Sequence, residues 1–198
     1  MKHLRLGVLV SGGGTTMQNL AEKIARGELD AEIVTCIAGN AACGGIEKAR
    51  RLGIRLTVIT RKESGSLAEF SRRIAEELRG AGTELALMAG FLSLWEIPAD
   101  LRGRVMNIHP ALLPKFGGKG MHGHYVHEAV LAAGEKESGC TVHFADNTYD
   151  TGPIIVQKRV AVLPGDTAEA LAKRVFEQEC VAYPEAIRMY AAGRARLS

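Results

Sequence analysis

The chain has 198 residues, of which 46% are hydrophobic and 24% charged, and its formal net charge is +3. This composition excludes a disordered chain and fits one globular domain over residues 1–198. The modest charge lacks the concentrated basic stripe expected of a nucleic-acid-binding protein, and no apolar segment approaches the length of a membrane span. We therefore expect neither nucleic acid nor a membrane as a partner.

The N-terminal half alternates apolar, β-branched runs with segments of helical periodicity. The predicted strands are residues 4–10, 33–38, 55–59 and 85–88, and the predicted helices are residues 17–26, 43–52 and 66–78. This alternation predicts an α/β fold with a doubly wound, mostly parallel sheet and helices on both faces.

The C-terminal half continues with a predicted strand over residues 104–108, a glycine-rich loop over 115–123 and a helix over 124–133. Residues 140–144 and 154–162 alternate apolar and polar side chains, which predicts antiparallel strands at the C-terminal part of the sheet. A long helix is expected from Thr167 towards Tyr190. Pro184 should break or kink that helix, because proline has no backbone N–H to donate.

Four cysteines, at positions 36, 43, 140 and 180, form no Cys-x-x-Cys pair and show no zinc or haem spacing. We expect free thiols in a reducing, cytoplasmic location. The first apolar run is too short for a signal peptide, which agrees with that location. The histidines between positions 122 and 143 are not paired with carboxylates at metal-binding spacing, so no metal is expected.

A glycine-rich turn, Ser11-Gly12-Gly13-Gly14-Thr15-Thr16, joins the first strand to the first helix. Such a turn favours an anion, because free N–H groups and the helix dipole point at it, and the threonine hydroxyls could add donors. The turn lacks the lysine of a nucleotide-binding P-loop, and no acidic residue ends the second strand as a dinucleotide fingerprint requires. A mononucleotide or sugar phosphate is favoured; a tight turn without a ligand is the alternative.

Residues 89–95, Ala-Gly-Phe-Leu-Ser-Leu-Trp, follow another buried strand. Ligands of open α/β sheets bind at the carboxyl ends of the strands, so this apolar segment could line a pocket for a flat, partly apolar ligand. The equal alternative is that Phe91 and Trp95 only pack under a loop.

Asn107 and His109 lie two residues apart at the end of the next strand, which Pro110 should terminate. Residues two apart in a strand point to one face, so the amide and the imidazole can enter one site. This pair suggests acid–base chemistry and stabilisation of an oxyanion, with a carboxylate from the turn at Asp146 to Asp150 as its partner. There is no serine or cysteine in a nucleophile elbow.

These motifs together resemble the phosphoribosylglycinamide formyltransferases, folate-dependent enzymes of purine biosynthesis. The most specific segments are Asn-Ile-His-Pro-Ala-Leu-Leu-Pro at 107–114 and Asp-Thr-Gly-Pro at 150–153. The turn at 11–16, Ala-Gly-Phe-Leu at 89–92 and Glu177-Gln178-Glu179 followed by Tyr183-Pro184 support them. The Asn-x-His-Pro signature is shared by the wider formyl-folate transferase superfamily. The resemblance implies a Rossmann-like formyltransferase fold.

The resemblance also implies an activity: transfer of the formyl group of 10-formyltetrahydrofolate, a co-substrate, to the amine of glycinamide ribonucleotide. Asn107, His109 and Asp150 would be the catalytic residues. Protonated His109 and the Asn107 amide would stabilise the tetrahedral oxyanion. Asp150 would hold His109 charged, because a nearby carboxylate raises the pKa of an imidazole.

By the same resemblance, the substrates would bind on either side of this group. The residues implied for the ribose phosphate and ribose are Gly14, Thr15, Thr16 and Glu179. The residues implied for the folate are Phe91, Leu92, Ser93, Leu94, Trp95 and Asp146. Thr16 replaces the usual asparagine and Ser93 replaces a common basic residue, while the loop at 117–123 is longer than in many members.

Other functions within the superfamily remain alternatives. A formyltetrahydrofolate hydrolase would need an extra N-terminal regulatory domain, and a methionyl-tRNA formyltransferase would need a basic C-terminal domain, for which we expect no room. A non-catalytic folate- or nucleotide-binding protein could share the fold. We expect small-molecule substrates and a monomer or homodimer.

Overall fold

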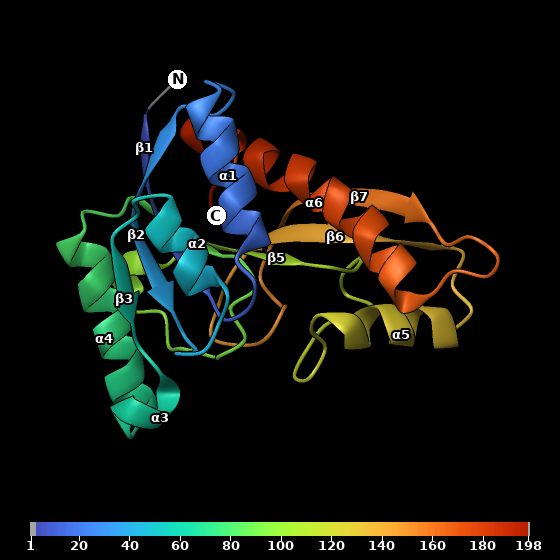
Figure 1. The fold of residues 1–198 in the computed structure, drawn as a ribbon, viewed down its shortest axis with the longest axis horizontal. Coiled ribbons are helices and arrows are strands. Elements are labelled where there is room, and N and C mark those ends of the chain that lie inside the picture. The colour runs from blue at the N-terminus through green and yellow to red at the C-terminus, as the bar shows by residue number, and fades with distance from the viewer. Residues whose placement is uncertain (1–2, 198) are drawn as a thin grey trace.

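The computed structural model describes residues 3–197, which are organised around one seven-stranded sheet (Figure 1). The strands are β1 (Leu4–Val10), β2 (Ala31–Ala38), β3 (Leu56–Val58), β4 (Leu85–Met88), β5 (Val105–His109), β6 (Glu137–Phe144) and β7 (Ile154–Ala161). Their order is β3-β2-β1-β4-β5-β6-β7. The pairs from β3 to β5 are parallel, and β6 and β7 are antiparallel to their neighbours. The predicted fold class is confirmed.

The helices follow the predicted segments, with one addition. They are α1 (Thr15–Ala25), α2 (Gly45–Arg51), α3 (Arg61–Ser64), α4 (Leu67–Gly80), α5 (His124–Ala132) and α6 (Ala168–Ala191), with a 3-10 helix at Ala99–Leu101. The side chain of Ser66 caps α4 by accepting from the Glu69 N–H, and Thr167 caps α6 in the same way. The unpredicted α3 is a single turn capped by Thr60, too short for a periodic pattern.

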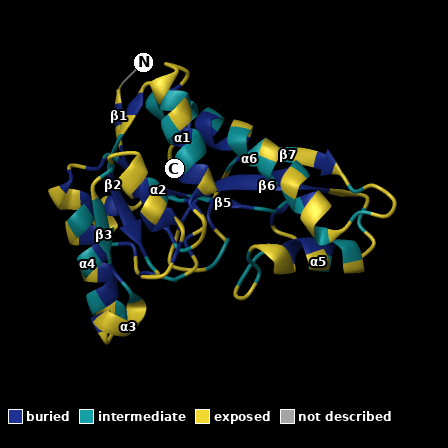
Figure 2. Cartoon of the chain, in the orientation of Figure 1, coloured by how far each residue is buried: buried dark blue, intermediate teal, exposed yellow. Residues whose placement is uncertain are grey.

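Helices cover both faces of the sheet, and successive side chains of β1 pack against helices on opposite faces. Leu6 and Val8 face the cluster formed with α1, α2 and α6, whereas Leu9 faces the cluster formed with α4. Figure 2 shows the inner strands as largely buried, whereas the edge strands β3 and β7 are only partly buried. A strand buried on both faces reads as a continuous apolar run, which is the pattern that residues 4–10 carry.

β6 begins three residues before its predicted start, because Ser138 and Gly139 carry no strand signal. Glu137 already pairs with Ala161 of β7. A Cβ on Gly139 would lie 1.9 Å from the Lys158 carbonyl oxygen, so the close approach of β7 requires glycine there. Glycine in a strand thus marks a close backbone approach that apolar periodicity does not detect.

α6 runs without a break through Pro184, so the prediction of a break is wrong. Proline removes the bond that the Cys180 carbonyl would accept from position 184. The side-chain amide of Asn19, on α1, lies 3.5 Å from that carbonyl oxygen and donates in its place. α1 and α6 pack against each other (Figure 1), so the neighbouring helix compensates for the missing donor.

The fold brings the carboxyl ends of β1, β4 and β5 together at one edge. Strand order reverses between β1 and β4, the position where open α/β sheets leave a crevice for ligands. The buried Tyr183 hydroxyl of α6 lies 3.2 Å from the Met88 carbonyl oxygen and 3.0 Å from that of Met106. One side chain from the last helix therefore joins the carboxyl end of β4 to the second residue of β5.

Candidate active site

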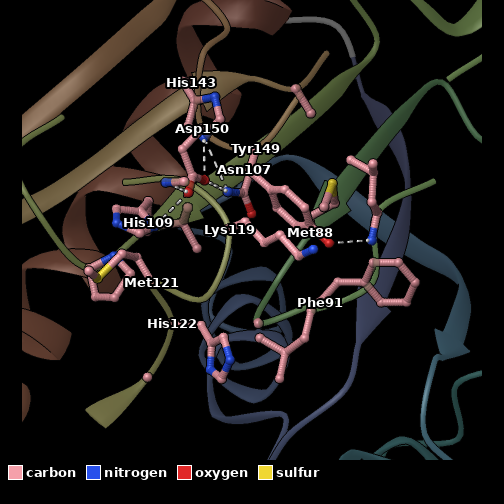
Figure 3. A pocket seen from close by; sticks show the side chains of 18 of the residues that line it. Met88, Phe91, Asn107, His109, Lys119, Met121, His122, His143, Tyr149 and Asp150 are labelled. Carbon is pink, nitrogen blue, oxygen red and sulfur yellow. Dashed lines mark hydrogen bonds and ion pairs between the residues drawn. The ribbon is translucent and has the colours of Figure 1, made fainter. Parts of the chain in front are cut away.

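Asn107 and His109 project from β5 to a common carboxylate, Asp150 (Figure 3). Nδ2 of Asn107 lies 3.2 Å from Oδ1 of Asp150, and Nδ1 of His109 lies 3.5 Å from Oδ2. His109 is 3% exposed, so the imidazole lies almost wholly inside the protein. The structure thus brings together the three residues that the resemblance implies as catalytic.

The turn that carries Asp150 is held tightly against β6. Asp150 has a φ of 57°, a left-handed conformation that Asp and Asn tolerate better than other side chains. A Cβ on Gly152 would lie 1.8 Å from the Phe144 carbonyl oxygen, so the turn admits only glycine there. The Gly118 N–H donates to Oδ2 of Asp150 over 2.9 Å. The carboxylate is therefore fixed from β6 on one side and from the loop at 117–123 on the other.

His143 sets the orientation of the Asn107 amide. Nδ1 of His143 lies 2.9 Å from the Phe144 carbonyl oxygen, which can only accept, so Nδ1 carries a proton. Nε2 of His143 then accepts from Nδ2 of Asn107 over 3.1 Å. Both amide hydrogens of Asn107 are thereby engaged, one by His143 and one by Asp150. The predicted structural role of His143 is compatible with this arrangement, but its partner is a candidate catalytic residue.

Burial determines the charge of His109. Nε2 donates to the Phe116 carbonyl oxygen over 2.8 Å. Burial lowers the pKa of His109, and the neighbouring Asp150 and the Phe116 carbonyl raise it without restoring its ordinary value. Asp150 thus acts in the expected direction on His109, but burial has the larger effect. The carboxylate moderates the loss of basicity but does not reverse it.

Asp150 itself is held ionised. Burial raises the pKa of Asp150, but the neighbouring His143 and His109 and the Gly118 N–H together outweigh it and leave the pKa below its usual range. The site at neutral pH thus contains a carboxylate beside a neutral imidazole. A carboxylate in that position can accept a proton from a reacting group.

Asn107, His109 and Asp150 line a cleft of about 500 Å³. Of the predicted binding residues, those that line the cleft are Thr16, Phe91, Leu92, Ser93, Leu94, Trp95, Asp146 and Glu179. Gly14 and Thr15 lie outside the lining set. The predicted anion end and the predicted flat-ligand wall are thus parts of one cavity, with Asn107, His109 and Asp150 in its lining.

The segment after β4 is joined to the Asp150 turn to form one wall. The Leu94 N–H donates to the Tyr149 hydroxyl over 3.2 Å, and the Ile97 N–H donates to Oδ1 of Asn147 over 2.8 Å. Phe91 stacks on Phe70 with ring centroids 6.3 Å apart. Phe91 therefore packs under the loop and lines the cleft as well, and its contact with a flat ligand stays a prediction.

Thr16 brings the start of α1 into the cleft lining. Gly14 caps the helix with a φ of 69°, and a Cβ there would lie 2.8 Å from the Gly45 Cα, so this turn requires glycine. Thr16 is buried and faces the cleft, where the N-terminal dipole of α1 favours an anion. Glu179 of α6 lines the same cleft, and burial raises its pKa to about 7.

Sequence reasoning assigned no role to several residues that line the cleft. They are Lys119, Met121 and His122 of the loop, His127 of α5, Tyr149 of the Asp150 turn and Phe176 of α6. The first three lie in an irregular loop, whose path no periodicity predicts. The helical positions of His127 and Phe176 are predictable, but their facing the cleft depends on how α5 and α6 pack.

The described residues contain neither a candidate metal site nor a helix that could span a membrane. Within residues 3–197, no group of three His, Cys, Asp or Glu side chains could hold a metal ion. No helix in that range is long and apolar enough to cross a membrane. The four cysteines are free thiols, as predicted.

The chain matches the family model for formyl transferases over residues 4–187 and belongs to that family. Its similarity extends to particular members. The chloroplastic phosphoribosylglycinamide formyltransferase of Arabidopsis thaliana is 41% identical over 188 residues, which cover 92% of this chain and 64% of that protein. The trifunctional purine biosynthetic protein adenosine-3 of Drosophila pseudoobscura pseudoobscura is 42% identical over 197 residues, 97% of this chain and 14% of that protein.

A solved structure shows the same likeness in three dimensions. Glycinamide ribonucleotide transformylase 1 from Symbiobacterium toebii superimposes with a TM-score of 0.90 at 37% identity, over 99% of this chain and 91% of that chain. The chain spans less than two thirds of the length of the Arabidopsis and Drosophila relatives.

Proposed function

We propose that the protein transfers the formyl group of 10-formyltetrahydrofolate to the amine of glycinamide ribonucleotide, a step of purine biosynthesis. One observation carries the proposal. Asn107, His109 and Asp150 converge on a cleft whose lining also includes Thr16, at the start of α1, and the apolar segment from Phe91 to Trp95. The names of the Arabidopsis and Symbiobacterium relatives agree with this activity.

The cleft offers each substrate a chemically suited end. The phosphate of the ribonucleotide suits the start of α1, with Gly14, Thr15 and Thr16, and the ribose hydroxyls suit Glu179. The flat pterin suits the wall from Phe91 to Trp95 together with Asp146. Substrates held in this way would place the amine and the formyl carbon near Asp150, where proximity alone lowers the barrier.

The reaction begins when the amine nitrogen attacks the formyl carbon, whose oxygen becomes an oxyanion. Asn107 can donate to that oxyanion only by giving up one of its two present acceptors. The contact with Asp150, at 3.2 Å, is longer than the contact with His143, at 3.1 Å, and weakens once the carboxylate accepts a proton. The proton that Asp150 accepts from the amine can be shared with the neighbouring Nδ1 of His109, and the charged imidazole would then stabilise the oxyanion until that proton passes to the folate nitrogen.

One proton must move from the attacking amine to the folate nitrogen. The ionised Asp150 accepts it as the amine nitrogen becomes positively charged. The proton then passes to the folate nitrogen, directly or through water, as the bond between that nitrogen and the formyl carbon breaks. The products are the formylated amine and tetrahydrofolate, so atoms and charge balance.

The proposal is tested by mixing the protein with 10-formyltetrahydrofolate and glycinamide ribonucleotide and following release of tetrahydrofolate. Release that requires the ribonucleotide supports the transferase. Release without it identifies a formyltetrahydrofolate hydrolase, and binding of both ligands without release identifies a non-catalytic binding protein. Either of these two results rejects the proposal.

The remaining expectations concern the whole protein. Residues 1–198 would act as one domain, which the participation of elements from β1 to α6 in one sheet and its coverings supports. The protein would work as a monomer or homodimer, without nucleic acid or a metal cofactor. A cytoplasmic location is also proposed, although the Arabidopsis relative is named chloroplastic. Light scattering at several protein concentrations measures the oligomeric state.

A further inference from the structure

Lys119 is the one Lys or Arg among the cleft-lining residues of the described chain. Its ammonium group has no hydrogen-bond or ion-pair partner among residues 3–197. The side chain points into the cleft, as Figure 3 shows. An unpaired cation in a substrate cleft is suited to an anionic group of a ligand.

The loop at 117–123 fixes the backbone beside Lys119. Gly118 and Gly120 flank it with φ values of 98° and 88°, a conformation that side chains rarely adopt. A Cβ on Gly117 would lie 2.5 Å from Cδ2 of Leu113, so the start of the loop packs against the Leu113 side chain. The Gly118 N–H is bound to Asp150, only one residue from Lys119. The hydrogen bond from Gly118 therefore holds the backbone of Lys119 close to the candidate catalytic carboxylate.

Exposure distinguishes the two ends of the cleft. Lys119 is exposed, whereas Thr16, at the proposed phosphate end, is 8% exposed. On the folate wall, Phe91 and Trp95 are 6% and 1% exposed. A folate is flat and largely apolar at its pterin end and carries the carboxylates of glutamate at its other end. Because charged groups stay near water, the carboxylate end belongs at the exposed mouth, where Lys119 lies.

We propose that Lys119 binds a carboxylate of the glutamyl tail of the formyl donor and so contributes to recognition of that substrate. This inference rests on the proposed function, which supplies the donor. The ammonium acts as a positive charge on a flexible stem, which suits a mobile tail better than a rigid fork would. It forms no part of the bond-making step.

The test compares Lys119→Ala with Lys119→Arg and with a control, Lys62→Ala. Lys62 lies on α3, is exposed and lies outside the cleft-lining set, so its loss changes the net charge equally. We expect Lys119→Ala to raise the KM for 10-formyltetrahydrofolate about fivefold, which corresponds to the free energy of an exposed ion pair. The value of kcat should stay within about twofold. Lys119→Arg should keep most of the affinity, and Lys62→Ala should match the unaltered protein.

A second donor identifies the contact. For 10-formyltetrahydropteroate, which lacks the glutamate, Lys119→Ala and the unaltered protein should have the same KM. An equal rise for both donors, or no rise for either, overturns the proposal. A rise confined to glycinamide ribonucleotide, absent with its dephosphorylated form, assigns Lys119 to the phosphate and also overturns it.

Binding separates this inference from the proposed function. Quenching of Trp95 fluorescence, from the single tryptophan of the chain, measures the affinity for tetrahydrofolate and for tetrahydropteroate without turnover. If the unaltered protein transfers no formyl group, the proposed function fails. A Lys119→Ala effect that appears only with the glutamate-containing ligand would still support the contact, and its absence would overturn it.

Discussion

Asn107 of β5 and His143 of β6 are directly paired in the antiparallel register, and their side chains meet, with Nδ2 of Asn107 3.1 Å from Nε2 of His143. Nε2 can accept because Nδ1 donates to the Phe144 carbonyl oxygen. The orientation of the Asn107 amide is therefore determined by the protonated ring nitrogen of a neighbouring strand.

His143→Leu should lower kcat about tenfold, because a lost hydrogen bond of about 1.4 kcal/mol leaves the Asn107 amide free to rotate. The KM of each substrate should change by less than about twofold, since His143 acts through Asn107 and Asp150. His143→Gln, which retains an acceptor, should recover part of kcat. Steady-state kinetics measure both constants, and thermal unfolding checks that each variant is folded. A normal kcat in His143→Leu contradicts the assigned role.

Asp150→Asn should reduce turnover by about a thousandfold while both substrates still bind, because the amide cannot accept the proton of the attacking amine. Asparagine tolerates the left-handed φ of 57° at this position, so the variant isolates the charge from the backbone conformation. Single-turnover kinetics with equilibrium binding separate the two effects. Turnover near that of the unaltered protein would reject Asp150 as the proton acceptor.

Thr16→Ala should raise the KM for glycinamide ribonucleotide about tenfold, the usual size of a lost hydrogen bond to a charged group. The KM for the folate should stay within about twofold. Thr15→Ala should raise this KM less, because Thr15, although part of the proposed phosphate site, is exposed and lies outside the cleft lining, whereas Thr16 is buried and lines it. Equal effects of the two substitutions would place the phosphate elsewhere.

Stability should fall as pH decreases from about 6.5 to about 4, because His127 is buried uncharged. Burial lowers its pKa to about 4 from 6.5, with His124 and His109 adding to the shift. In this window the unfolded imidazole binds a proton that the native one does not, so unfolding becomes easier by up to about 3 kcal/mol. Above pH 6.5 both states are uncharged and the effect vanishes.

Urea unfolding at pH 7 and pH 4.5 measures that change. His127→Leu should show a smaller loss of stability between the two pH values than the unaltered protein. Nδ1 of His127 has no hydrogen-bond partner among the described residues, so leucine leaves no broken bond behind there. An unchanged pH dependence in His127→Leu would show that other groups cause it.

The sequence predicts elements with regular periodicity well and predicts contacts between distant segments poorly. The alternating runs from Leu4 to Met88 are enough to predict the parallel sheet, because each strand and helix repeats its own pattern. The predicted β6 is too short because the close approach of β7 requires glycine at position 139, and glycine carries no strand signal in the sequence. Pro184 is misjudged because Asn19, far away in sequence, supplies the missing donor.

The same distinction applies to the site. Asn107 and His109 are two apart on one strand, so local geometry predicts that they face one site. Their partner Asp150 follows from the resemblance to a family. The engagement of both Asn107 hydrogens and the low basicity of His109 depend on burial and on His143, which only the assembled fold shows.

The contact between Asn19 and Cys180 has a consequence for substrate size. Asn19 is one helical turn from Thr16 on α1, and Cys180 follows Glu179 on α6. The bond that replaces the Pro184 donor therefore joins the two helices beside the proposed phosphate and ribose contacts. We expect a ligand with a longer or shorter link between its phosphate and its hydroxyl groups to bind more weakly, because the two contacts come from different helices.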